Sequence, residues 1–471
     1  MDSDNYNNIN LNENQEEQHA TQNPDSANQS SQISQSQASY QNDVVSSTYQ
    51  RARKISRIDQ ENPFLQNFAA DMNILIEVTG YKLLDSSISK YAMFTVSGKD
   101  RNGDFEIERR YSDFDQLRKL MLKRWPGCFI PPLPSKKAIG NTESGFLNER
   151  KKYLHTFCNR IAKLGYLYYS AEFQLFIRHK SKEEISKKLQ TLEDISVVTI
   201  IEKFKGQFFQ LAGQEVTPEL QNSIQKFQQF LKTSKEILRD QRTTIEELTQ
   251  SRKNTDLALR KFQKFTIQRY ERDILSEYTL GRKSDMIYIN DNESTDIQKQ
   301  IDSFGEVIEI EPFTLLYDLI NFELKDTQAF LDTLETKDFY VLRKKNLETT
   351  LNEKKSQLSD LMNGKKTLRN IFTKKDPETQ KEILKNDIAN LEQEIVANNE
   401  LNEIIIGIIG MIEIEKYKEQ KARQYYEVMT TVSKLELECL EKQQKLWSLI
   451  NQTANQKLQN FNQRNPINKN Y

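Results

Sequence analysis

Three short segments carry basic side chains in settings that suit recognition of a phosphate. Residues 108–114 (ERRYSDF) end an expected strand, residues 130–137 (IPPLPSKK) form a stiff proline-rich loop, and residues 149–154 (ERKKYL) follow a helical pattern. A phosphorylated head group needs charge-assisted donors in a fixed geometry and a surface on which its ring can pack. Each segment alone is typical of a solvated basic patch. Their conjunction, in this order, predicts a site for a phosphorylated head group.

The segments between these residues predict the elements that must position them. Three stretches rich in β-branched and aromatic residues, separated by turn signals at Gly80 and residues 99–103, predict a three-stranded antiparallel meander at residues 72–78, 91–96 and 105–111. Helical spacing follows at residues 112–124, with Phe114, Leu117, Leu120 and Met121 on one side, and at residues 145–164 and 171–178. Residues 70–182 are therefore expected to form an α+β domain, sheet first and helices after. Because neighbours on a strand point to opposite faces, only one of Arg109 and Arg110 can line a given pocket.

The basic charge of the chain is concentrated in this domain. The whole chain of 471 residues has 67 basic and 68 acidic side chains, which argues against a chain that binds nucleic acid along its length. Residues 70–182 hold 20 Lys and Arg against 12 Asp and Glu, a net charge of +8. The expected partner of this domain is thus an anionic surface, and nucleic acid is disfavoured.

The patterns of the common enzyme classes are absent from the sequence. It contains no P-loop, no Gly-x-Gly-x-x-Gly, no His-Glu-x-x-His and no Gly-x-Ser-x-Gly segment. We therefore expect that this protein is not an enzyme. The three histidines are scattered, His155 being expected on a helix surface, and the three cysteines have no Cys-x-x-Cys spacing. These counts predict free thiols in a reducing compartment and neither a metal site nor a cofactor. The polar, acidic start lacks a secretory signal, so a cytoplasmic protein is expected.

The regions that flank the α+β domain have different compositions. Residues 1–68 are rich in Asn, Gln and Ser and predict a disordered tail, with a basic cluster around Ser56. Residues 183–212 predict an amphipathic linker that either lies on a bilayer or packs against the rest of the chain. Apolar residues at three-to-four spacing over residues 213–460 predict three long helices with breaks at Pro312 and residues 363–377, and Asn398 falls on their seam. The most apolar stretch, residues 404–412 (IIIGIIGMI), is about half the length of a membrane span and predicts a buried helix segment.

The segments RRYSDF, IPPLPSKK and ERKKYL resemble the PX (phox-homology) domain, over about residues 70–182. The resemblance implies a pocket for phosphatidylinositol 3-phosphate. It assigns the 3-phosphate to Arg110, the face of the inositol ring to Tyr111, the 1-phosphate to Lys136, and the 4- and 5-hydroxyls to Arg150.

Two further groups in this domain are expected to face the membrane. An electrostatic role near an anionic leaflet is expected for Arg109, Lys137, Lys151 and Lys152. The apolar tip formed by Trp125, Phe129 and Ile130 is expected to contact the membrane, with core packing as the alternative for Trp125.

A PX domain followed by three long helices is similar to the sorting nexins that carry a BAR domain, here over residues 183–460. That similarity implies a curved dimer, with itself or with another sorting nexin, peripheral on the cytosolic face of endosomal membranes. Its implied role is endosomal protein sorting and vesicle trafficking, with cargo or coat proteins as possible partners. A dimer couples two weak lipid sites, so membrane residence would require both lipid and curvature. The alternative is a PX-bearing coiled-coil tether or scaffold that does not remodel membranes.

A basic loop between the second and third long helices is expected at the tip of this dimer. It is expected to touch the membrane, a solvated helix turn being the alternative, through Lys365, Lys366, Arg369, Lys374 and Lys375.

Overall fold

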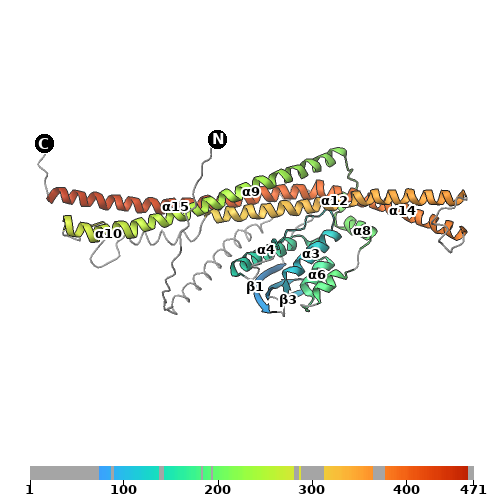
Figure 1. Ribbon diagram of the computed structural model, residues 1–471, viewed down its shortest axis with the longest axis horizontal. Helices are drawn as coiled ribbons and strands as arrows, with labels where there is room; N and C mark the ends of the chain where they lie inside the picture. Colours follow the sequence, from blue (N-terminus) through green and yellow to red (C-terminus); the bar gives the residue numbers. More distant parts are fainter. Residues whose placement is uncertain are drawn as a thin grey trace, which may run out of the picture. The chain divides into compact units, whose positions relative to one another are not determined.

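The computed structural model in Figure 1 describes nine ranges of the chain. These are residues 74–85, 90–136, 143–181, 184–192, 195–280, 286–287, 297, 312–363 and 377–464. The predicted tail, Ser56, Lys137 and the basic loop from Lys365 to Lys375 lie outside the described residues.

The sheet consists of β1 (Leu75–Asp85), β2 (Lys90–Asp100) and β3 (Gly103–Arg110), antiparallel in the order β1-β2-β3. Ile74, Ile76 and Val78 alternate into the core, and a bulge between Val78 and Gly80 shifts the register. The turn between β2 and β3 places Gly103 at φ +95, a left-handed conformation that favours glycine. The predicted three-stranded meander is confirmed, with strands longer than expected.

Four helices complete the α+β domain. They are α3 (Tyr111–Arg124), α4 (Ser144–Ala162), α5 (Gly165–Tyr168) and α6 (Ala171–Arg178). α3 buries Phe114, Leu117 and Met121, as its spacing predicted. α4 packs along β1, where His155 Nδ1 accepts a hydrogen bond from the backbone N–H of Val78 at 3.2 Å. The expected surface position of His155 is therefore wrong.

The linker is built from α7 (Ile185–Gln190), α8 (Val197–Gln207) and the turn η2 (Phe209–Leu211). Ile185 and Leu189 of α7, and Ile200 and Phe204 of α8, are buried in the same core as the α+β domain. Of the two alternatives for this segment, the structure thus shows packing within the chain.

The rest of the described chain forms long helices. The first runs through α9 (Pro218–Lys261), η3 (Phe262–Ile267), α10 (Gln268–Tyr270) and η4 (Glu271–Leu280). The second is α12 (Pro312–Met362), and the third runs through α14 (Pro377–Gly407), η6 (Ile408–Glu413) and α15 (Ile414–Arg464). α12 packs against α9, α14 and α15 (Figure 1). The predicted long helices are confirmed over the described residues, with α12 beginning at Pro312 and α14 at Pro377, whereas the predicted break at residues 363–377 lies almost entirely outside the described residues.

The centre of the helical region is packed around the most apolar stretch of the sequence. Ile405, Ile408, Ile409 and Ile412 are fully buried, and a Cβ on Gly410 would lie 2.6 Å from Leu220 Cδ1. By length and composition the helix Glu378–Arg464 could cross a membrane. Its apolar stretch is nevertheless the predicted buried helix segment. On the same helix, buried Asn398 donates to Tyr340 O of α12 at 3.0 Å, so it joins two helices of one chain.

Candidate functional site

The two consecutive arginines at the end of β3 have separate environments. The Arg109 guanidinium is fully buried and donates to the carbonyl oxygens of Glu108, Phe176 and His179. Burial lowers the pKa of Arg109 to about 10. Arg109 therefore ties β3 to the end of α6, and the expected role at an anionic leaflet is wrong for this residue.

Arg110 instead points its charge toward solvent. Its guanidinium carbon lies 3.6 Å from the centroid of the Tyr91 ring on β2, and among the described residues it forms no ion pair. The backbone N–H of Arg110 donates to Asp113 Oδ2 at 2.8 Å, which fixes the passage from β3 into α3. The alternation along the strand thus leaves Arg110, and not Arg109, available to a ligand.

Tyr111 and Arg150 meet between the starts of α3 and α4. The Arg150 guanidinium carbon lies 4.2 Å from the centroid of the Tyr111 ring and 4.3 Å from that of Phe146. Its Nη2 lies 3.5 Å from Ser135 O, and the Tyr111 hydroxyl donates to Pro134 O. The proline-rich loop is thereby drawn against both side chains.

Arg150 is a buried cation whose hydrogen bonding is incomplete. Only 7% of its surface is exposed, its Nε has no hydrogen-bond partner, and it forms no ion pair among the described residues. Burial lowers the pKa of Arg150. Because a buried charge is normally paired, an unmet donor here favours a ligand that brings oxygen acceptors.

Lys136 stands at the end of the proline-rich loop. Its Nζ lies 2.8 Å from Asp115 Oδ2 on α3, and Lys119 Nζ approaches the same oxygen at 3.0 Å. Burial alone would raise the pKa of Asp115, but hydrogen bonds from Lys136 and Lys119 outweigh it and hold that pKa below its usual value. Asp115 is a site residue that the sequence analysis missed, although its position one helical turn after Tyr111 was a usable signal.

Together these contacts bring Tyr111, Arg150 and the loop before Lys136 into one site, with Arg110 next to Tyr111 in the chain. The site offers the cations of Arg150 and Lys136 and an aromatic face, with Asp115 as an acidic neighbour, whereas the Arg110 side chain lies over Tyr91 of β2. Such an arrangement suits a phosphorylated ring.

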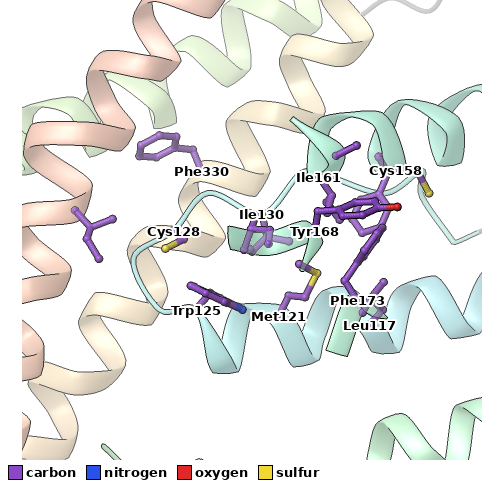
Figure 2. Close-up of a cluster of buried hydrophobic side chains, with 14 of the residues drawn as sticks. Leu117, Met121, Trp125, Cys128, Ile130, Cys158, Ile161, Tyr168, Phe173 and Phe330 are labelled. Atoms are coloured by element: carbon purple, nitrogen blue, oxygen red, sulfur yellow. The ribbon is translucent and has the colours of Figure 1, made fainter. Parts of the chain in front are cut away.

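The apolar tip expected at the membrane is covered by the rest of the chain. Trp125 is 3% exposed, its Nε1–H donates to Glu172 Oε1 at 2.5 Å, and its ring stacks on Phe204 of α8. Phe129 packs on Phe330 of α12, and Ile130 is fully buried. Figure 2 shows Trp125, Cys128 and Ile130 in the cluster that Phe330 joins. The membrane-contact prediction is therefore wrong for Trp125 and Ile130, which are buried in the core, while Phe129 is half-buried against α12 and its membrane contact stays a prediction.

One of the expected leaflet lysines also faces the long helices. Lys152 Nζ lies 2.5 Å from Asp318 Oδ2 of α12, so this lysine binds α4 to α12 and its membrane role is wrong. The role of Lys151 stays a prediction.

Comparison with known proteins gives three results. A family profile for the PX domain matches residues 98–180. Sorting nexin-7 of Mus musculus is 36% identical over 100 residues, which are 20% of this chain and 26% of that protein. Sorting nexin-4 of Eremothecium gossypii is 23% identical over 414 residues, 78% of this chain and 94% of that protein. The match to sorting nexin-7 thus spans about a quarter of that relative, whereas the match to sorting nexin-4 spans nearly all of that relative.

Among solved structures, the cryo-electron microscopy structure of the SNX-BAR Mvp1 tetramer aligns with a TM-score of 0.48 and 16% identity, covering 80% of this chain and 99% of that chain. A designed CISK-PX domain aligns with a TM-score of 0.21 and 26% identity, covering 22% of this chain and 98% of that chain.

Proposed function

We propose that this chain is a sorting nexin with a PX domain followed by a BAR-type region of long helices, and that it docks on endosomal membranes through phosphatidylinositol 3-phosphate. As a dimer it would sense or induce curvature there, on the cytosolic face, in endosomal protein sorting. The alternative function is that of a PX-bearing coiled-coil tether or scaffold that does not remodel membranes, and the tests below distinguish the two.

The observation that carries the lipid proposal is the environment of Arg150. A guanidinium held between two aromatic rings, with an unmet Nε and no carboxylate partner among the described residues, is preorganised for the hydroxyls of an inositol ring. Exposed Arg110 supplies a charge for the 3-phosphate, and Lys136 supplies one for the 1-phosphate. The ring of Tyr111, the first residue of α3, is half-buried beside Arg150 of α4 and would support the face of the inositol ring.

The dimer proposal rests on apolar surface along two helices. α9 exposes Phe230, Ile237 and Leu248, which follow one another at two and then three helical turns. α15 exposes Leu440, Trp447 and Leu458 with the same spacing. Such stripes on long helices are buried when a second copy covers them. A cavity of about 380 Å³ lined by Phe227, Phe230 and Tyr417 continues the α9 stripe.

The lipid proposal is tested by sedimenting the full chain with liposomes that contain or lack phosphatidylinositol 3-phosphate. Arg110→Ala is expected to weaken binding at least tenfold, the loss of about 1.4 kcal/mol or more that a charge-assisted phosphate contact represents. Arg101→Ala is the matched control, because the Arg101 guanidinium stacks on Tyr169 at 3.7 Å much as Arg110 stacks on Tyr91.

Equal binding by Arg110→Ala and Arg101→Ala would refute the assignment of the site. Electron microscopy of the same pellets then separates the two functions, since narrow tubules support curvature and unchanged vesicles support the tether.

A further inference from the structure

The proline-rich loop of the candidate site is held by an arginine that belongs to α3. Arg118 Nε donates to Pro131 O at 2.9 Å, and its Nη2 lies 3.5 Å from Ile130 O. A few residues further on, the same loop supplies Pro134 O to the Tyr111 hydroxyl and Ser135 O to Arg150. The position of Arg118 therefore sets where Lys136 and the loop carbonyls stand relative to Tyr111 and Arg150.

Arg118 is in turn oriented from outside the α+β domain. Its Nη2 lies 2.8 Å from Asp332 Oδ2 on α12, and both side chains are largely shielded from solvent. Asp332 Oδ1 accepts from Gln328 Nε2 at 2.9 Å, and Gln328 Oε1 accepts from Lys235 Nζ of α9 at 2.6 Å. A continuous polar chain thus runs from α9 through α12 to the loop of the candidate site.

The second ligand-bearing element, α4, is fixed to the same helix. Lys152 pairs with Asp318, the Tyr153 ring lies 4.7 Å from that of Phe322, and Arg160 pairs with Asp326. These three partners are all on α12. Arg150 points instead toward Tyr111, so one face of α4 binds α12 while another lines the site.

We propose that Asp332 is a positioning residue for the head-group site: by orienting Arg118, it holds the proline-rich loop at the distance from Tyr111 and Arg150 that a phosphorylated inositol requires. This inference rests on the proposed function. Without the carboxylate, Arg118 and the loop regain rotational freedom that ligand binding must then remove. Head-group affinity thus depends on a residue of the long helices that does not touch the ligand.

The test is calorimetry of the full chain with a water-soluble, short-chain phosphatidylinositol 3-phosphate, which needs neither a bilayer nor curvature. Asp332→Ala is expected to weaken binding by about three- to tenfold, the effect of ordering one or two side chains. Asp332→Glu, whose carboxylate can still reach Arg118, is expected to stay within about twofold of the wild type, a difference of about 0.4 kcal/mol.

Asp338→Ala is the matched control, because Asp338 lies on α12 and pairs with Lys337 of its own helix. It is expected to bind as the wild type does. Asp332→Asn keeps the side-chain volume and an acceptor oxygen, so it reports on the charge in a folded protein should the alanine variant unfold, and a two- to fivefold loss of about 0.4–1 kcal/mol is expected.

The outcomes separate this inference from the proposed function. If the wild type binds, Arg110→Ala fails to bind, and Asp332→Ala and Asp332→Asn both bind like the wild type, the positioning role is refuted while the site stands. Equal losses in Asp332→Glu and Asp332→Ala also refute it, since the carboxylate would not be the cause. If the wild type does not bind the soluble lipid, the proposed function fails and this inference fails with it.

Discussion

Replacing Asp326 with asparagine tests how the α+β domain is fixed to the long helices. Asp326 of α12 is 1% exposed, and its two oxygens accept from Arg160 of α4 and from Lys421 of α15. Lys421 also lies 2.9 Å from Glu323 Oε1. The substitution keeps the size of the side chain, removes its charge and so breaks two buried ion pairs that join three elements.

The expected cost follows from these contacts. Removing one partner of a buried ion pair costs about 3–5 kcal/mol, because the opposite charge stays buried. Lys421 retains Glu323, and the amide oxygen of asparagine can still accept one hydrogen bond. We therefore expect the lower end of the range, about 3 kcal/mol of unfolding free energy at pH 7. Asp240→Asn on the exposed surface of α9 is the control, with an effect within about 0.5 kcal/mol.

The pH dependence supplies a second, signed expectation. Burial would raise the pKa of Asp326, but Arg160 and Lys421 outweigh it and the pKa lies below its ordinary value. The unfolded chain, with a carboxyl pKa of about 3.9, then takes up the proton first as the pH falls. The contribution of Asp326 to stability is complete above about pH 5 and is lost as the pH falls through the folded pKa. The difference in unfolding free energy between the wild type and Asp326→Asn should therefore become smaller as the pH falls below about 5.

The assay is urea unfolding followed by the fluorescence of buried Trp125. A Trp447→Phe background removes the other of the two tryptophans. A destabilisation below about 1 kcal/mol at pH 7, well under the expected range, would refute the reasoning. A difference in unfolding free energy between the wild type and Asp326→Asn that grows as the pH falls would also refute it.

Two further predictions concern stability and assembly. Arg109→Met should lower the unfolding free energy by about 2–4 kcal/mol, because the carbonyls of Phe176 and His179 lose their donor. Arg110→Met is the control and should change the unfolding free energy by less than about 0.5 kcal/mol. Equal thermal unfolding of the two variants would contradict this prediction. Trp447→Glu should weaken dimer affinity at least tenfold, about 1.4 kcal/mol, because it places a charge among the exposed apolar residues of α15. Sedimentation velocity measures the effect, with Trp447→Phe as the control. An unchanged dimer would show that this apolar stripe of α15 is not the interface.

Much of the candidate site followed from local rules of sequence. The period-two alternation of a strand separated Arg109 from Arg110, and the structure indeed buries one and exposes the other. Helical spacing placed Phe114, Leu117 and Met121 on one buried face, and the prolines marked where the long helices begin. These features depend on neighbours within a few residues, so a single sequence contains them.

The tertiary structure decided which exposed-looking residues are covered. Trp125, Phe129 and Lys152 carry nothing in their own segments that reveals α8 and α12, which lie far along the chain and yet bury or bind them. The link from Asp332 through Arg118 to the loop likewise joins residues more than two hundred positions apart. The sequence by itself determined the elements and their order, because these depend on local periodicity, and its motifs supplied the candidate residues of the site. Only the fold determined which faces meet, because burial depends on distant segments.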